Sequence, residues 1–357
     1  MILKPSPDTE NDSLANFTEK TRKAPAIDWY RTPISREEFK SLHARSDFLG
    51  FFQTVGTLGI LATTGAMAIY SLAHWRWEIT LAIIFAHGMV TAFLINGVHE
   101  LGHGTVFKTK WLNSFFCHIF AFLGWINHEM FQASHQRHHR YTLHPPDDLE
   151  VVLPVPLMIW HVFKTGIINP LAAWNTWKNT VRIARGKFSG AWEMTLYPKD
   201  KPESHRATMR WARILLLGHS AIVAISLGLG YWIVPVLVTL APFYGGWLFF
   251  LCNNTQHIGL RDNVPDFRLC CRTFTLNSWV RFLYWQMNYH TEHHMYAAVP
   301  CYRLGRLHRL IQHDLPPTPH GLVAVWKDIG GILKKQHPDP TFQHQVVLPP
   351  DAAPARL

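Results

Sequence analysis

Eight histidines fall into three short motifs, each beside an apolar stretch. The motifs are His99-Glu-Leu-Gly-His103, His135-Gln-Arg-His138-His139 and His290-Thr-Glu-His293-His294. Residues three or four apart lie on the same face of a helix, so each motif presents two or three imidazoles in one direction. Neutral imidazole is a strong ligand for iron, copper, nickel and zinc. Because eight ligands are more than one ion binds, the sequence predicts two metal ions.

A fourth short segment adds two candidate ligands at the end of an apolar run. Asn253 and His257 are four residues apart in the sequence NNTQH, so on a continuing helix they face the same way. We predict His257 as a ninth imidazole ligand and Asn253 as a candidate water-mediated ligand. The alternative is a helix-end asparagine beside an unrelated histidine.

Acidic residues near the motifs are candidates to orient the imidazoles. A metal-bound imidazole usually needs a hydrogen-bond partner on its other ring nitrogen. The candidates in the sequence are Glu100, Asp147, Asp148 and Glu292. Glu150 also lies close by, but a solvent-facing charge is at least as good an interpretation for it.

The elements that must position these residues are predicted to lie in a membrane. Hydrophobic residues make up 48% of the chain and charged residues 16%, below the roughly 25% charged that is typical of soluble proteins. Four apolar runs have about the 20 residues that a spanning helix needs, at about 48–72, 77–98, 212–230 and 231–252. A shorter run at 112–126 indicates a re-entrant or protein-buried helix. We expect an all-α integral membrane protein with four transmembrane helices.

The placement of charge predicts the topology. Of the 34 lysines and arginines, only Arg76 lies in the two short turns that join the first and second pairs of spans. Since positive residues stay on the cytoplasmic side, both termini, the central loop and a helical cap with all three motifs are expected there. The predicted parts are an N-terminal cytoplasmic tail at 1–45, a membrane domain at 46–320 and a C-terminal cytoplasmic tail at 321–357. We expect the chain to be loose over 1–30 and after His337.

Other features of the composition exclude some classes of function. The net charge of +10 fits the positive-inside bias and attraction to anionic lipid, and no nucleic-acid-binding motif accompanies it. The five cysteines have no zinc-site spacing and are expected to be free thiols in a reducing compartment. His87 lies inside a predicted span, where we expect it to share a hydrogen bond with a neighbouring helix.

These motifs resemble those of the membrane fatty acid desaturase superfamily. Its pattern is H-x3/4-H, H-x2/3-H-H and H/Q-x2/3-H-H around four spans, and the resemblance covers roughly residues 46–320. It implies that the eight motif histidines bind two irons, that His257 is an additional ligand, and that Asn253 is the amide beside it. It also implies O2-dependent introduction of a carbon–carbon double bond into a fatty acyl or other lipid-like chain.

The chain departs from some branches of that superfamily. Its first motif has three intervening residues, not the four typical of acyl-CoA delta-9 enzymes, and its third motif opens with histidine where front-end desaturases often have glutamine. No H-P-G-G haem-binding motif is present. We therefore expect electrons from a separate protein, such as a ferredoxin, a flavodoxin or a cytochrome b5, whose acidic surface suits a basic cytoplasmic face.

Three alternatives stay open at this point. A membrane di-iron hydroxylase or ketolase shares the motifs, and NTQHIGL resembles a sequence near the alkane hydroxylase site. His-Glu-Leu-Gly-His also matches the H-E-x-x-H signature of zinc proteases, with His99 and His103 as ligands and Glu100 as base. A non-catalytic metal transporter or sensor is the third, but its histidines are expected within the spans.

Overall fold

The structure is a computed structural model that describes residues 26–155, 157, 159–198 and 200–357. Within this part of the chain the regular structure is helical, and four isolated β-bridges are present in place of strands. The all-α prediction is therefore confirmed. The predicted N-terminal tail falls mostly on residues 1–25, outside the described residues.

The helices are α1 (Arg36–Leu42), α2 (Asp47–His74), α3 (Trp77–Ala92), α4 (Leu94–Gly102), α5 (Lys110–Leu123), α6 (His128–Tyr141), α7 (Ile159–Gly166), α8 (Pro170–Ala184), α9 (Ala191–Leu196), α10 (Pro202–Gly228), α11 (Ile233–Val238), η2 (Ala241–Phe243), α12 (Trp247–Asn253), α13 (Phe267–Cys270), α14 (Ser278–Leu283), α15 (His290–Met295), α16 (Cys301–Ile311), η3 (Gln312–Asp314) and α17 (Gly321–Gln336).

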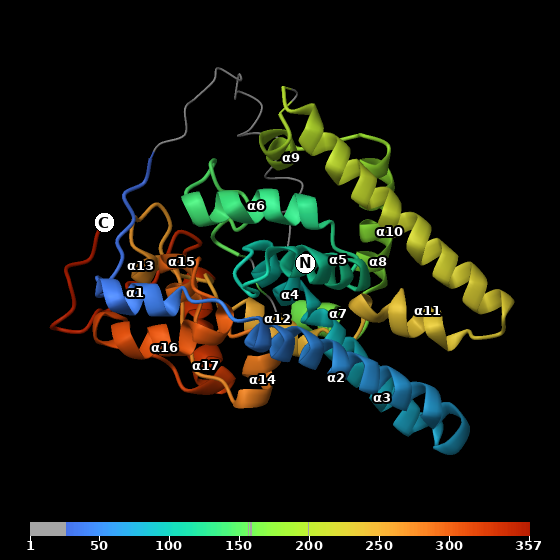
Figure 1. Ribbon diagram of the computed structural model, residues 1–357. Coiled ribbons are helices and arrows are strands. Elements are labelled where there is room, and N and C mark those ends of the chain that lie inside the picture. The colour runs from blue at the N-terminus through green and yellow to red at the C-terminus, as the bar shows by residue number, and fades with distance from the viewer. Residues whose placement is uncertain (1–25, 156, 158, 199) are drawn as a thin grey trace.

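Three helical segments of the described chain are long and apolar enough to cross a membrane. They are α2, the continuous stretch of α3 and α4 (Trp77–Gly102), and α10, with 28, 26 and 27 residues. Large apolar side chains point outward from them, as at Phe48 (78% exposed) and Leu217 (72% exposed). Figure 1 shows the hairpin of α2 and α3 and the long helix α10 extending away from the other helices. Such apolar outer surfaces suit contact with lipid.

The prediction of a fourth continuous spanning helix is wrong. Its residues divide into α11, η2 and α12. Pro235 and Pro242 have no backbone N–H to donate, which weakens a helix at those positions. Gly245 has a φ of +69°, and a Cβ there would lie 2.4 Å from the carbonyl oxygen of Phe85. The chain therefore bends at Gly245 because only glycine allows this close contact with α3.

Side chains satisfy the carbonyl groups that this break releases. Nε2 of His87 lies 2.8 Å from the carbonyl oxygen of Leu237, and Nε1 of Trp125 donates to the carbonyl oxygen of Thr239 at 2.9 Å. Unpaired backbone groups are costly in an apolar environment, so these contacts stabilise the broken segment. The expectation that His87 shares a hydrogen bond with a neighbouring segment is confirmed.

Most of the remaining helices form a body at one end of the long helices, with α6 lying across its upper part and α13 and α15 below it, whereas α8 and α11 lie along α10 (Figure 1). One large core cluster joins the two parts, from Val98 on α4 to Trp285 and Leu304 in the body. Residues from 321 onward, predicted as a C-terminal tail, pack against the body. Val325 and Ile329 of α17 are fully buried in the core, and the N–H of Ala353 donates to Asp314 at 2.8 Å.

Candidate metal centre

Four segments carry the nine predicted histidine ligands. The first motif ends α4, where His99 is helical and His103 is the C-terminal cap. The second motif occupies the C-terminal half of α6, a helix that begins where the Asn127 side chain accepts a hydrogen bond from the N–H of Met130. The third motif forms most of α15. Because α12 ends at Asn253, His257 lies in the following turn and the two residues do not share a helix.

The nine histidines gather into two groups. In each group every residue offers one ligand atom, and these atoms lie within 4.8 Å of one another. The first group is His99, His103, His135, His139 and His293, and the second is His138, His257, His290 and His294. The structure thus brings every predicted histidine into one of two clusters, and their binding of metal stays a prediction.

The two H-x-x-H-H motifs divide their side chains between the groups in opposite ways. In α6, His135 and His139 belong to the first group and His138 to the second. In α15, His290 and His294 belong to the second group and His293 to the first. Residues four apart stack on one helix face, whereas the third residue points to one side. Each of these helices therefore contributes to both groups.

The ring nitrogens within a group have the spacing expected of shared ligands. Nε2 of His139 lies 2.8 Å from that of His135 and 3.0 Å from that of His293. In the second group, Nε2 of His290 lies 2.9 and 3.1 Å from the Nε2 atoms of two other members. Two nitrogens at right angles around an ion that binds each at about 2.1 Å lie about 3.0 Å apart. The observed spacing therefore fits coordination of one ion by each group.

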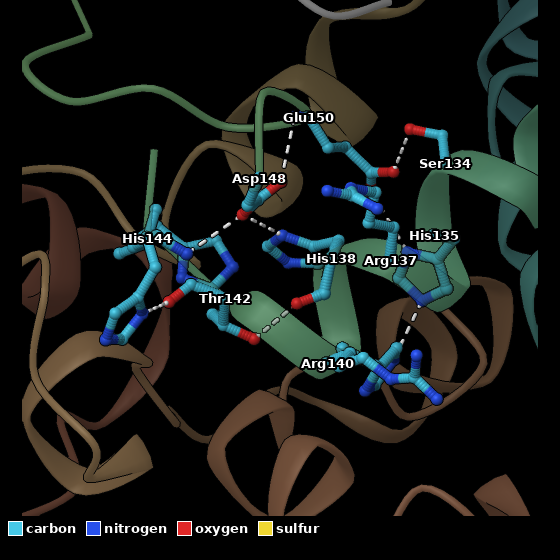
Figure 2. A network of polar contacts seen from close by, with 12 residues as sticks. Ser134, His135, Arg137, His138, Arg140, Thr142, His144, Asp148 and Glu150 are labelled. Atoms are coloured by element: carbon cyan, nitrogen blue, oxygen red, sulfur yellow. Dashed lines mark hydrogen bonds and ion pairs between the residues drawn. The ribbon is translucent and has the colours of Figure 1, made fainter. Parts of the chain in front are cut away.

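Two carboxylates from the segment after α6 orient histidines of that helix. Nδ1 of His138 lies 2.7 Å from Oδ2 of Asp148, and Nδ1 of His135 lies 3.0 Å from Oε1 of Glu150. Figure 2 shows both acids over the helix, with Glu150 also accepting a hydrogen bond from Ser134. Glu150 is 9% exposed, so the interpretation of it as a solvent-facing charge is wrong. Its distance from the motif in sequence gave no sign of this contact.

Two more histidines also have an acceptor at Nδ1. Nδ1 of His99 lies 2.9 Å from Oε1 of Glu100, and that of His257 lies 2.8 Å from the carbonyl oxygen of Cys270. A carbonyl oxygen only accepts, and an ionised carboxylate only accepts. The ring of His257 therefore carries its hydrogen on Nδ1 and has a free electron pair on Nε2, the atom left for a metal, and an ionised Glu100 gives His99 the same form.

Thr142 fixes a fifth ring in the same way. Its hydroxyl donates to the carbonyl oxygen of His138 at 2.7 Å, so the hydroxyl oxygen must accept from Nδ1 of His294, 3.1 Å away. Five histidines thus have a hydrogen-bond partner at Nδ1, which leaves Nε2 as the atom for a metal. This arrangement of outer partners is typical of metal-bound imidazoles.

Burial keeps these imidazoles neutral. It lowers the pKa of His103 to about 4 and that of His257 to about 3. Burial, with the other imidazoles around them, also holds the pKa values of five more well below the usual range: His135, His139, His290, His293 and His294. For His138 the effect of burial is outweighed by Asp148, whose charge and hydrogen bond raise the pKa. Only the deprotonated ring nitrogen binds metal, so lowered pKa values favour binding.

Several polar atoms in the groups have no hydrogen-bond partner among the described residues. They are Nε2 of His103 and the Nδ1 atoms of His139, His290 and His293. Buried polar atoms are rarely left unpaired. A bound ion would satisfy Nε2 of His103, and nine imidazoles are a suitable donor set for two iron ions. The residues present therefore fit a pair of irons.

The other predicted acids contact residues outside the histidine groups. Asp147 pairs with Arg137, whose Nη2 lies 3.1 Å from Oδ1 of the acid. Glu292 accepts hydrogen bonds from Thr273 and from Nδ1 of His308, both at 2.5 Å. Glu292 therefore fixes the position of α15 against neighbouring segments. The half-buried Asn253 accepts a hydrogen bond at its backbone carbonyl oxygen from the backbone N–H of Gln256. Its role as a water-mediated ligand stays a prediction.

Comparison of the sequence with known protein families identifies the family of this chain. A family model described as Fatty acid desaturase matches residues 75–326, a stretch that contains all nine histidines. The chain belongs to the fatty acid desaturase family.

A curated relative in the family supports the same assignment. The chain is 24% identical over 306 residues to an sn-1 oleoyl-lipid 12-desaturase of Picosynechococcus sp., a match that covers 78% of this chain and 82% of the relative. The family makes this protein an oxidoreductase of lipid metabolism associated with membranes. The H-E-x-x-H protease interpretation is not supported, because His99 and His103 share a group with three further histidines.

Proposed function

We propose that this protein is a membrane di-iron desaturase that uses O2 to introduce a carbon–carbon double bond into a fatty acyl or other lipid-like chain. The observation that carries the proposal is the convergence of nine histidines into two adjacent groups. The family and the relative that acts as an oleoyl-lipid desaturase support it. The identity of the lipid and the position of the new bond are not part of the proposal.

Each histidine group would hold one iron. His99, His103, His135, His139 and His293 hold the first, and His138, His257, His290 and His294 hold the second. Asn253, next to the turn that carries His257, is proposed to bind through a water molecule. When bound, the two irons would supply the oxidising power that breaking an unactivated C–H bond requires.

The net reaction needs partners outside the chain. The substrate loses two hydrogen atoms from neighbouring carbons, and one O2 is reduced to two waters with two electrons and two protons from outside. The electrons come from a separate donor of the ferredoxin, flavodoxin or cytochrome b5 type. We place the cap, the active site and both termini on the cytoplasmic side, where such a donor is available.

The protein's own residues hold the site in a form ready to bind metal. Five histidine rings are held in place at Nδ1 by Glu100, Asp148, Glu150, Thr142 and the carbonyl group of Cys270, so that Nε2 is the atom left for a metal. Seven of the nine histidine side chains belong to buried residues. This burial excludes bulk water, which favours reaction at the bound lipid chain over side reactions.

Product analysis with labelled oxygen tests the proposal. Membranes with the active protein, a reducing system and 18O2 should yield a lipid with a new double bond and no 18O. An alcohol or ketone that retains 18O would instead assign the protein to the di-iron hydroxylases or ketolases, which share the histidine motifs. Turnover that is independent of O2 would contradict both assignments.

A further inference from the structure

A cavity of about 550 Å³ lies on the body between α17, the Pro-rich segment after η3 and the residues that lead from His257 to α15. Thr273 and Thr291 form part of its wall, and Thr291 directly follows His290. Ligand sites in proteins have about 300–1,000 Å³, so the cavity has room for a small molecule. The family match ends at residue 326, and α17 contributes cavity residues beyond that point.

The cavity gathers positive charge. Arg272, Lys327 and Lys335 line it, and Asp328 is the one carboxylate among the described lining residues. Arg268 also lines the cavity but forms ion pairs with Asp266 and Asp314, so the other three positive groups and Asp328 leave a charge of +2. Burial and the nearby charges of Arg272 and Lys335 lower the pKa of His344, which also lines the cavity, so this imidazole is mainly neutral.

Arg272 has hydrogen-bond acceptors but no ion pair. Its Nη1 and Nη2 donate to the carbonyl oxygens of Thr255 and Ile258, at 2.5 and 3.0 Å. No carboxylate of the described chain lies within ion-pair distance of it. Burial lowers the pKa of Arg272 to about 10. A desolvated guanidinium without an anionic partner is unfavourable.

A second arginine of the same cavity wall shows the usual arrangement. Arg268 forms ion pairs with Asp266 and Asp314, each at 2.7 Å. The chain thus neutralises the buried guanidinium of Arg268 with its own carboxylates, whereas the half-buried Arg272 lines the cavity without an ion pair. Asp328 acts on Arg272 through its charge alone. The remaining positive charge of the cavity indicates a counter-ion from outside the chain.

We propose that this cavity binds a phosphate-bearing small molecule. A phosphate carries a charge of about −1.5 to −2 at neutral pH, which matches the +2 of the cavity. Guanidinium groups bind phosphate oxygens in pairs, and lysines add point charges at the rim. Leu260, Ile332 and Val346 supply an apolar wall for the remainder of the ligand. The phosphate can come from a free metabolite or from a lipid headgroup, and the site does not depend on the di-iron proposal.

The test uses the full-length protein in detergent and two probes. Isothermal titration calorimetry with inorganic pyrophosphate tests the free anion, and dihexanoyl phosphatidic acid against dihexanoyl phosphatidylcholine tests a lipid headgroup. The variants are Lys327→Gln, Lys335→Gln and the double variant, because both lysines are exposed and should tolerate the change. Lys334→Gln is the matched control, since it removes the same charge from α17 outside the cavity wall.

Saturable binding of either phosphate probe to the wild-type protein is expected. The double variant should bind at least about tenfold more weakly, since each hydrogen bond to a charged group contributes substantially, and Lys334→Gln should stay within about twofold. Binding of pyrophosphate indicates a free ligand, and binding of phosphatidic acid alone indicates a headgroup. No saturable binding of either probe, or an equal loss in Lys334→Gln and the double variant, would overturn the proposal.

Discussion

The hydroxyl of Thr142 lies 3.1 Å from Nδ1 of His294 and joins the second histidine motif to the third. Thr142 ends α6 as its cap, and His294 lies on α15, 152 residues further along the chain. The same hydroxyl donates to the carbonyl oxygen of His138. One side chain thus links two members of the second group without being a ligand itself.

Replacing Thr142 with valine should weaken metal binding by the second group. Valine has a similar shape but no hydroxyl, so Nδ1 of His294 would lose its acceptor in a buried position. Loss of such an outer partner typically reduces metal affinity or activity about 10- to 100-fold. Metal content by mass spectrometry and product formation check this. Thr142→Ser keeps the hydroxyl and should retain near-normal values, and equal losses in both variants would point to packing instead.

Glu150 should matter more than its neighbour Asp147. In Glu150→Gln, an NH2 group that only donates replaces one of the two carboxylate oxygens. The side chain then loses one of the two acceptors that His135 and Ser134 use. We expect a fall in activity of about 10- to 100-fold. Asp147→Asn affects the pairing with Arg137 and should cost no more than a few-fold. The reverse order of effects would mean that Asp147, which the sequence favours, orients the metal ligands.

Single ligand replacements should abolish activity without loss of the fold. His99→Ala, His138→Ala and His293→Ala each remove an imidazole from a different motif. The loss of product should exceed the roughly 100-fold that removal of an outer partner causes. The exposed His337, at the end of α17, is the control, and His337→Ala should keep near-normal turnover. Near-normal activity of any ligand variant would exclude its motif from the centre.

The metal-free protein should lose stability as the pH falls below about 6.5. Unfolded histidine titrates near pH 6.5, whereas the folded pKa values of His103 and His257 are lowered to about 4 and 3. Between these folded pKa values and pH 6.5 the unfolded chain binds more protons than the folded chain, so the free energy of unfolding decreases as the pH decreases. The raised pKa of His138 acts in the opposite direction, but it is one group against several.

Thermal unfolding in a chelator from pH 8 to pH 5 measures this effect. His257→Asn should make the dependence less steep, and His337→Asn should leave it unchanged. A midpoint that stays constant between pH 7 and pH 5 would contradict the lowered pKa values.

The sequence predicts the histidine groups well because ligand spacing is a local property. Residues four apart share a helix face, so the pairs His135–His139 and His290–His294 follow from the motifs, but the assignment of His138 and His293 to the opposite groups does not. The outer partners are different. Asp148 and Glu150 are close in sequence and both are acidic, yet only the fold shows that each contacts a histidine. Thr142 carries no signal at all, because its role depends on contact with a distant helix.

The fourth span shows a similar limit for the fold. Average hydropathy treats 231–252 like the other runs, but it does not register two prolines and Gly245 in contact with α3. The carbonyl groups freed there are satisfied by His87 and Trp125 from other parts of the chain. Such compensation depends on tertiary packing and is not visible in a local window of sequence.

The count of iron ions per chain tests the central claim most directly. The protein is purified, reconstituted anaerobically with ferrous iron, freed of excess metal and analysed for iron and zinc against protein concentration. Two groups of histidines, each with ligand atoms within 4.8 Å of one another, predict close to two irons per chain. One iron per chain or less, with zinc in its place, would contradict the di-iron centre.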